Sequence, residues 1–257
     1  MLSTNQIKYL KSLSQKKIRQ KENKIILDGF RLVEEAVKQK VDIEHIWLQK
    51  DYENDNSKVF FLKNLNKNKI KFSFELEKDI KKISNTRNSQ GILALVSISN
   101  LFNSDLDKFK KNIIVLDCIS DPGNLGTIIR TCSWFNINSI ILTKNSLDIF
   151  NDKCIRSSMG GHFYIKNLAY LNYPEINSFL KLNNYSIIGA DMNGQSINQF
   201  ILNEKWALVL GSEAHGISES LNYNHKVCIP AKGNIESLNV SIAAGIILNQ
   251  LIYHQKK

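Results

Sequence analysis

Short apolar runs alternate with amphipathic segments along the first hundred residues. In residues 30–39 the apolar positions Leu32, Val33, Ala36 and Val37 fall on one face at helical spacing. The same reasoning predicts further helices at 57–65 and 78–84, and strands at 24–29, 43–49, 70–76 and 91–98. Strands that alternate with helices in this way predict a small α/β domain.

The alternation restarts after a polar stretch with few apolar positions. We interpret residues 100–111 as a linker between a domain at 1–99 and a larger domain at 112–257. In the larger domain the pattern predicts strands at 113–118, 137–143, 163–168, 185–191, 206–211 and 226–230, and helices at 125–135, 148–160, 173–182 and from about 238 to 253. Near-continuous apolar strands separated by helices predict a parallel sheet that is covered on both faces.

The positive charge is concentrated in the first part of the chain. Of the net charge of +10 over 257 residues, residues 1–100 hold 20 Lys and Arg against 12 Asp and Glu, whereas residues 101–257 hold 14 against 12. Such an asymmetry is typical of a domain that binds a polyanion. A coding bias towards Lys and Asn, visible in "KNLNKNKIKF", is the alternative. Because bias explains the abundance of lysine but not its segregation, we favour nucleic acid.

Several classes of protein are disfavoured by composition. The sequence has no apolar run of the eighteen or so residues that a membrane helix needs, and its basic N-terminus lacks the apolar core of a secretory signal. The four cysteines, at 118, 132, 154 and 228, and the five histidines show no metal-ligand spacing. We therefore expect a cytoplasmic protein with no metal and no disulfide.

Three of the predicted strands end in loops of unusual composition. These loops are "LDCISDPGNLG" at 116–126, "LVLGSEAHGIS" at 208–218 and "CIPAKGNIESLNVS" at 228–241. In an open parallel α/β sheet, ligands bind beyond the carboxyl ends of the strands. We expect the three loops to converge at one edge and to form the functional site.

The first loop leads into a helix whose buried stripe can be assigned. Leu125, Ile128, Ile129 and Cys132 lie at helical spacing, so Arg130 points away from the core. Asn124 is predicted to cap the helix. Taken alone, a capping asparagine and a solvated arginine need no catalytic explanation.

The other two loops combine glycine with polar side chains. Gly211 and Gly216 would let the backbone approach a ligand, and Glu213 lies where site residues collect, although a plain turn with a solvated glutamate fits equally well. The third loop is predicted to lead to a helix that is capped by Ser237, with Asn239 in its first turn. The small residues at 243–245 would allow close packing against a cofactor, a helix or a strand.

Together these segments resemble the SpoU/TrmH family of RNA ribose 2′-O-methyltransferases, within the SPOUT superfamily. The three motifs appear in order as "NLGTIIRT", "LVLGSEAHGIS" and "IPAKGNIESLNVSIAAG", and the resemblance covers residues 112–254. A weaker likeness, in "LDGFRLVEEAV" and "SQGILALVSI", links the first domain to the basic substrate-binding domain that many members carry. Cys132 and Ser133 stand where the family usually has small or alanine-like residues.

The resemblance implies a parallel-sheet SPOUT domain with a C-terminal trefoil knot, working as a homodimer. It implies that S-adenosylmethionine binds against Gly211, Ile229 and Leu238. The residues that it implies for catalysis are Asn124, Arg130, Glu213, Ser237 and Asn239. By this similarity Arg130 binds the phosphate next to the target ribose and polarises its 2′-hydroxyl, while Glu213 balances the positive charge. Whether Arg130 also accepts the proton stays open.

The expected activity is therefore metal-free methylation of a ribose 2′-hydroxyl in structured RNA. The additional N-terminal domain favours ribosomal RNA, and transfer RNA is the alternative. A non-catalytic RNA-binding protein with the same fold is disfavoured because the motif residues are intact. A dinucleotide-dependent dehydrogenase is disfavoured because the sequence lacks the G-x-G-x-x-G fingerprint and its acidic partner.

Overall fold

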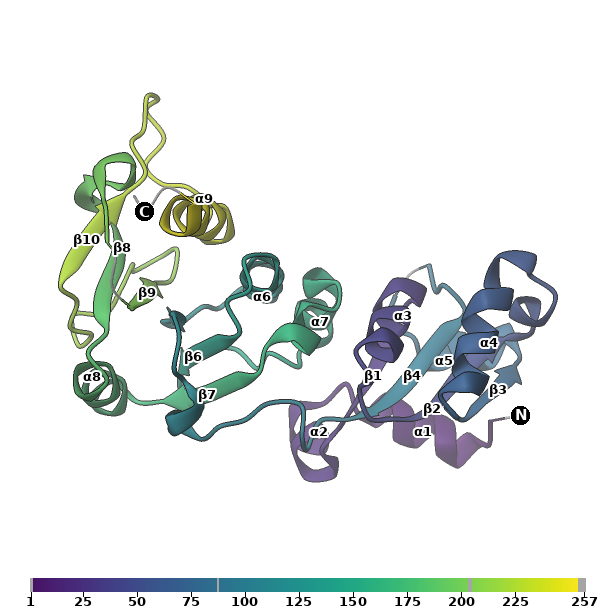
Figure 1. The fold of residues 1–257 in the computed structure, drawn as a ribbon. Helices are drawn as coiled ribbons and strands as arrows, with labels where there is room; N and C mark the ends of the chain where they lie inside the picture. The colour runs from purple at the N-terminus through teal and green to yellow at the C-terminus, as the bar shows by residue number, and fades with distance from the viewer. Residues whose placement is uncertain (1, 87, 203–204, 254–257) are drawn as a thin grey trace. The chain divides into compact units, whose positions relative to one another are not determined.

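The computed structural model describes residues 2–86, 88–202 and 205–253, and the chain folds as two units (Figure 1). Unit 1 contains the described residues of 1–101 together with 150–163, and unit 2 contains those of 102–149 and 164–257. Residues 150–163, which the sequence pattern places inside the second domain, thus pack with unit 1. No helix in the described part of the chain is both long enough and apolar enough to cross a membrane.

Unit 1 is built on a mixed sheet in the order β1-β4-β2-β3. Its strands are β1 (Lys24–Asp28), β2 (Ile43–Gln49), β3 (Phe72–Glu75) and β4 (Ile92–Ser97). β4 runs antiparallel to both β1 and β2, and β3 runs parallel to β2. The strands predicted from the hydrophobic pattern are therefore confirmed, and their pairing is a finding of the structure.

Helices cover both faces of this sheet. One face packs against α3 (Phe30–Lys38) and α4 (Val59–Lys67), and the other against α1 (Thr4–Ser12) and α5 (Glu77–Ile83). Short 3-10 turns, η1 (Lys50–Glu53) and η2 (Asn56–Lys58), lead into α4. The predicted helices in this unit are confirmed in position.

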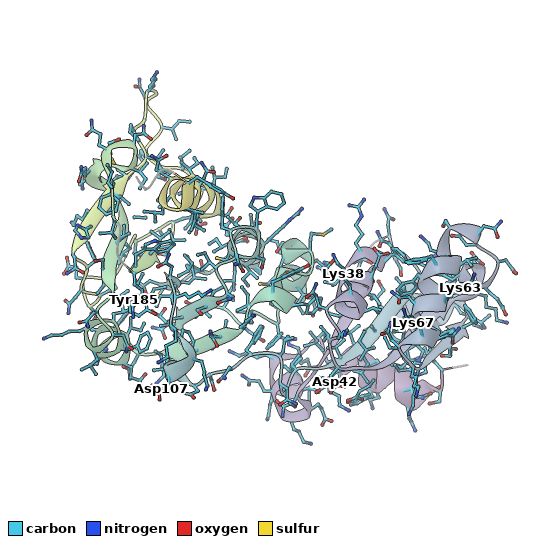
Figure 2. The ribbon with its side chains drawn as sticks, viewed as in Figure 1. Lys38, Asp42, Lys63, Lys67, Asp107 and Tyr185 are labelled. Carbon is cyan, nitrogen blue, oxygen red and sulfur yellow. The ribbon has the colours of Figure 1, made fainter. Side chains whose placement is uncertain are left out.

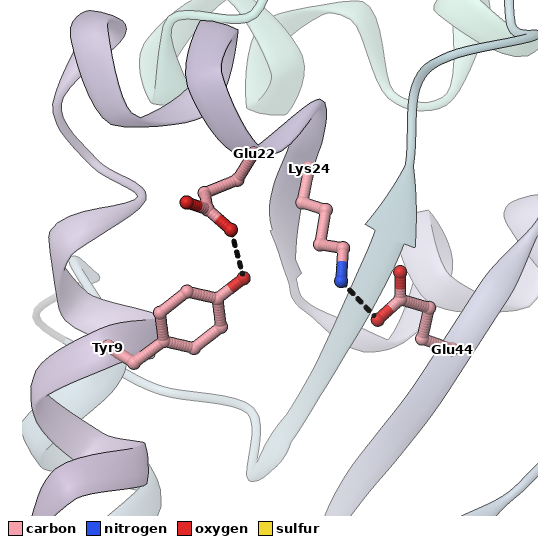
Figure 3. Close-up of polar contacts among 4 residues, drawn as sticks. All are labelled: Tyr9, Glu22, Lys24 and Glu44. Atoms are coloured by element: carbon pink, nitrogen blue, oxygen red, sulfur yellow. Dashed lines mark hydrogen bonds and ion pairs between the residues drawn. The ribbon is translucent and has the colours of Figure 1, made fainter.

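Two further helices, α1 and α2 (Lys16–Glu22), precede β1 and were not predicted. The Tyr9 hydroxyl of α1 donates a hydrogen bond of 3.5 Å to Glu22 of α2, and the Lys24 ammonium lies 2.8 Å from Glu44 (Figure 3). Burial raises the pKa of Tyr9, and the hydrogen bond to Glu44 raises the pKa of Lys24. The first contact joins α1 to α2 and the second joins β1 to β2, while the apolar side chains Leu10 and Leu13 pack the N-terminal segment against the sheet.

The segment 150–163 contributes α7 (Asp152–Ser158) to unit 1. Ile155 is buried in the same apolar cluster as α3 and α4. The Asn85 amide donates a hydrogen bond of 2.6 Å to Asp152, whose pKa is raised by burial. The helix is shorter than the predicted range of 148–160, because Asn151 caps its first turn.

Unit 2 contains, among its described residues, a six-stranded sheet in the order β10-β8-β9-β5-β6-β7. Every pairing in it is parallel, as the near-continuous apolar strands predicted. The strands are β5 (Ile113–Leu116), β6 (Ser139–Thr143), β7 (Asn167–Leu171), β8 (Ser186–Ser196), β9 (Trp206–Leu210) and β10 (His225–Cys228). The predicted bounds of the strand at 163–168 are wrong: residues 161–164 form the 3-10 turn η4, and the strand begins only at Asn167.

The helices of unit 2 lie on opposite faces of the sheet (Figure 1). α8 (Tyr173–Leu182) packs Ile176, Phe179 and Leu180 against β5, β6 and β9. Tyr185, labelled in Figure 2, closes this core with its hydroxyl, whose single hydrogen is shared between the carbonyl oxygens of Phe109 and Lys111 at 2.8 and 2.9 Å. α6 (Pro122–Trp134) and α9 (Val240–Tyr253) pack against each other on the other side. The remaining short turns are η3 (Leu106–Lys108) and η5 (Ile197–Gln199).

Candidate active site

The three unusual loops follow β5, β9 and β10, whose carboxyl ends lie at the same edge of the parallel sheet. The loop after β5 leads into α6, the loop after β9 begins at Gly211, and the loop after β10 leads into α9. This edge is where ligands bind in open α/β folds. The predicted convergence of the loops is therefore the arrangement that the structure has.

Helix α6 is capped by Asp121 and not by Asn124, so the predicted cap is wrong. The Asp121 carboxylate accepts the Asn124 N–H at 2.9 Å, and Pro122 occupies the first turn. Proline suits this position because its missing N–H has no partner there in any helix. With the cap supplied by Asp121, the side-chain amide of Asn124 is available for other contacts.

That amide joins the second and third loops. Asn124 Nδ2 donates a hydrogen bond to Oε1 of Glu213, and Asn124 Oδ1 accepts one from Asn239 Nδ2 at 2.9 Å. Glu213 is 89 residues and Asn239 is 115 residues from Asn124 along the chain. One continuous chain of hydrogen bonds thus links all three motifs.

Asn239 also caps α9, where Ser237 was predicted to do so. Its Oδ1 accepts hydrogen bonds from the backbone of Ser241 at 3.0 Å and Ile242 at 3.4 Å, and from the Ser241 hydroxyl at 2.6 Å. Ser237 is exposed and, within the described residues, makes no hydrogen bond to the other candidate site residues. The capping prediction is therefore wrong, because the helix begins at Val240, three residues after Ser237.

Arg130 takes no part in this hydrogen-bonded cluster within the described structure. The stripe that was predicted to be buried, Leu125, Ile128, Ile129 and Cys132, is buried, and Arg130 is exposed beside it. No described residue forms a hydrogen bond or an ion pair with its guanidinium. The guanidinium is therefore available to an external anion, and its position in the helix does not depend on a side-chain contact.

Gly211 is required by the turn itself. A Cβ at Gly211 would overlap the carbonyl group of Gly216, because Ser212 and Gly216 exchange backbone hydrogen bonds of 2.9 and 3.1 Å across it. Gly216 has φ of +68°, in the left-handed region where glycine is favoured. Both glycines were read as allowing close approach to a ligand, and the structure gives them this additional reason.

The loop from Ile229 to Leu238 has polar backbone groups without backbone partners. Among the described residues, none of its N–H or C=O groups takes part in a backbone–backbone hydrogen bond. Ile235 and Leu238 expose 82% and 49% of their surface. Free donors and acceptors beside apolar side chains suit a ligand that has both polar edges and an apolar ring, as a nucleoside does.

The sequence analysis missed Asp117, which is buried at the end of β5. Its carboxylate accepts the Ser218 N–H at 2.8 Å and the Tyr173 hydroxyl at 3.1 Å, so it ties the Gly211 loop to α8. The hydrogen bond with Cys118, together with burial, raises the pKa of Tyr173 to about 12. A carboxylate that directly follows an entirely apolar strand was the available signal.

Comparison with known families gives two matches on different parts of the chain. The SpoU rRNA Methylase family matches residues 111–249. The MRM3-like substrate binding domain matches residues 4–94. The first match contains all three motif loops, and the second lies within unit 1.

Individual relatives match over nearly the full length. The 23S rRNA (guanosine(2553)-2′-O)-methyltransferase RlmP of Bacillus subtilis is 31% identical over 96% of this chain and 94% of its own. An RNA methyltransferase of the TrmH family from Porphyromonas gingivalis has a TM-score of 0.83 at 28% identity, covering 99% of this chain and 100% of that one. The AdoMet-bound rRNA methyltransferase of Sinorhizobium meliloti, at 23% identity, shares the fold with a TM-score of 0.84, covering 100% and 97%.

Proposed function

Because the chain belongs to the SpoU rRNA methylase family, we propose that it methylates a ribose 2′-hydroxyl of ribosomal RNA with S-adenosylmethionine as donor. The observation that carries the proposal is the hydrogen-bonded chain Glu213–Asn124–Asn239, which joins the three family motifs at one edge of the sheet. A protein that only bound RNA would not need this side-chain geometry between distant motifs.

We propose that the cofactor binds against Gly211, Ile229 and Leu238. These residues follow β9, follow β10 and precede α9, and they border the loop whose backbone groups lack backbone partners in the described structure. When bound, S-adenosylmethionine supplies an activated methyl group on a sulfonium. The Glu213 carboxylate, held by Asn124, is assigned the role of balancing that charge.

The methyl acceptor needs a group that stabilises the charge on its oxygen. In the proposed reaction the ribose oxygen bonds to the methyl carbon, the electron pair of the broken carbon–sulfur bond stays on sulfur to give the neutral thioether S-adenosylhomocysteine, and the hydroxyl proton passes to solvent water. Arg130 is assigned the adjacent phosphate and the polarisation of the hydroxyl, because an unpaired guanidinium binds phosphate in a bidentate fashion. Asn124 and Asn239 hold Glu213, and Ser237 completes the site from the exposed loop.

Unit 1 is assigned the capture of RNA. It contains the segment similar to a substrate binding domain and most of the net positive charge, +8 of +10 within residues 1–100. Phosphate contacts from lysine and arginine give RNA binding its affinity and its salt dependence. Ribosomal RNA is favoured over transfer RNA because the Bacillus subtilis relative is a 23S rRNA methyltransferase, and such a substrate would place the protein in the cytoplasm.

A second copy of the chain is proposed to cover the outer face of α6 and α9. Trp134 exposes 81% of its surface, and Ile242, Ile246 and Tyr253 are exposed at helical spacing on α9. The two helices pack together, and the rings of Phe135 and Tyr253 meet at 6.0 Å. A contiguous apolar face of this kind marks a protein interface. Analytical sedimentation of the parent and of Trp134→Glu tests this interface. We expect the parent to sediment as a dimer and the variant as a monomer, and a variant that also sediments as a dimer would refute the interface.

A knotted C-terminal segment would explain the course of the chain. After β9 the chain passes β8 to reach β10 at the edge of the sheet, and it then returns to pack α9 against α6. Knots are nearly absent from protein folds in general, so we propose the trefoil knot in this segment on the family resemblance.

Methyl transfer to purified RNA tests the function directly. With labelled S-adenosylmethionine, a chelator and ribosomal RNA from cells that lack the gene, we expect one ribose position to become methylated, and the same position to be unmodified in those cells. Transfer RNA is the parallel substrate. Methylation of transfer RNA alone would show that transfer RNA, and not ribosomal RNA, is the substrate. A protein that binds RNA but neither binds S-adenosylmethionine nor transfers a methyl group would refute the proposal.

A further inference from the structure

We propose that the outer face of α4 binds a single-stranded part of the RNA, with Phe60 stacking on an unpaired base and Lys63 and Lys67 contacting the flanking phosphates. The inference rests on the proposed RNA substrate and adds a surface in unit 1 that lies outside the motif loops of unit 2. It names the side chains through which the first unit would capture RNA.

The two faces of α4 have opposite character. Phe61 and Leu65 are buried in the core of unit 1, and the Phe61 ring meets Phe30 edge-on at 5.1 Å. On the other face, Phe60, Lys63 and Lys67 are all exposed. At about 100° per residue these three positions fall within about 60° of one another around the helix axis. Figure 2 labels Lys63 and Lys67 on this helix.

Phe60 has no packing role that would explain its side chain. It exposes 80% of its surface, and the neighbouring Phe61 already fills the core position. A single exposed aromatic residue is common on protein surfaces and would not indicate a site alone. An exposed aromatic ring beside cationic side chains is an arrangement by which proteins bind single strands, stacking a base while the charges hold the backbone.

The charge around Phe60 complements a polyanion. Residues 56–71 contain five lysines and no Asp or Glu. Lys38 of α3 forms an ion pair with Glu35, and Lys82 of α5 forms one with Asp79, each within its own helix. Within the described residues, Lys63 and Lys67 form no ion pair, since α4 has no carboxylate to offer them.

The structure also bears on the alternative of coding bias. Biased substitution would place lysine wherever the fold tolerates it, including on helices with acidic neighbours. Lys58 is engaged, with its ammonium 3.9 Å from the centre of the Phe30 ring. Lys63 and Lys67 instead share one narrow face with the exposed Phe60, and bias in lysine codons accounts for neither the phenylalanine nor the shared face.

RNA binding by full-length variants tests the surface. The probes are a fluorescein-labelled unstructured RNA 12-mer and purified ribosomal RNA, titrated at several salt concentrations. Loss of one stacked base should weaken binding by about 5- to 150-fold in Phe60→Ala without changing the salt slope. The double variant Lys63→Gln/Lys67→Gln should lower the slope by about 1.4, since each phosphate contact on a single strand contributes about 0.7.

Matched variants on other helices control for the loss of exposed apolar area and of charge. Leu182→Ala removes an apolar side chain that is 81% exposed on α8, and Lys38→Gln/Lys81→Gln removes two exposed lysines that are paired with glutamates. Both controls should bind RNA as the parent does. All the substituted side chains are exposed, so the melting temperatures should stay together.

Methyl transfer separates this inference from the proposed function. The α4 variants should show a raised KM for RNA, an unchanged kcat and unchanged binding of S-adenosylmethionine. The α4 surface is refuted if these variants bind both RNA probes within twofold of the parent, or if they lose no more affinity than the controls. In either case a parent protein that methylates RNA leaves the proposed function intact. A parent that neither binds nor methylates RNA would overturn the proposed function instead.

Discussion

Asn239 has two contacts that single substitutions can separate. Its Oδ1 caps α9 by accepting the Ser241 and Ile242 N–H groups, and its Nδ2 donates to Asn124 Oδ1 at 2.9 Å. Asn239→Ala removes both contacts. Asn239→Asp keeps an acceptor at the start of the helix but has no donor for Asn124.

The expected sizes follow from these contacts. Loss of a helix cap costs about 1 kcal/mol, within a range of about 0.5–2 kcal/mol. In a protein of this size that lowers the melting temperature by roughly 2–4 °C, so Asn239→Ala should melt lower. Asn239→Asp should melt close to the parent, because a carboxylate is a good cap and is favoured by the helix dipole.

The two variants should nevertheless share a catalytic defect. Without the Asn239 donor, Asn124 loses the contact that fixes its amide, and the position of Glu213 is no longer defined. A small misplacement of a site residue can lower the rate on the order of 10²-fold. Both variants should therefore transfer methyl groups at about one-hundredth of the parent rate in a single turnover.

Thermal melts and single-turnover transfer of a labelled methyl group measure the two effects side by side. Asn198→Asp, an exposed substitution of the same kind elsewhere in unit 2, is the control and should change neither. Full activity in Asn239→Asp would show that the contact with Asn124 has no part in catalysis. A melting temperature of Asn239→Ala equal to that of the parent would show that the cap does not stabilise α9.

Three further predictions follow from individual residues. Gly211→Ala should lower the stability by about 1–3 kcal/mol, because the added Cβ would overlap the backbone of the same turn. Gly233→Ala is the control and should melt as the parent does, because no atom lies within 4 Å of its added Cβ. Equal melting temperatures for the two variants would show that the turn does not require glycine at 211. Arg130→Ala should melt with the parent and still bind S-adenosylmethionine, but transfer methyl groups about 10²–10³-fold more slowly; normal transfer would remove Arg130 from the site. Burial raises the pKa of Tyr52 and Tyr185 to about 12, so the stability that their neutral hydroxyls contribute should be complete below pH 10 and be lost as the pH rises towards 12. An ultraviolet titration of the tyrosines, with unfolding measured at each pH, tests this. Ionisation of every tyrosine near pH 10 would contradict it.

The sequence by itself determined most of the elements from β1 onward and most of their burial, although it did not indicate α1 and α2 and it misplaced the strand at 163–168. The stripe Leu125, Ile128, Ile129 and Cys132 could be assigned because a helix repeats every 3.6 residues, and near-continuous apolar strands indicated a parallel sheet. It also indicated which loops would meet, since the carboxyl ends of parallel strands share an edge. These inferences depend only on local periodicity and on general rules of sheet construction.

Only the tertiary structure decided which atoms in those loops touch. Asn124 looked like a helix cap, and it became a link between Glu213 and Asn239 because Asp121 took the capping position. The packing of residues 150–163 with unit 1 was equally invisible, because Ile155 is apolar in either setting. Periodicity reports which side of an element is buried, whereas the partner of a polar group depends on strand order and on residues a hundred positions away, and that information exists only in the folded chain.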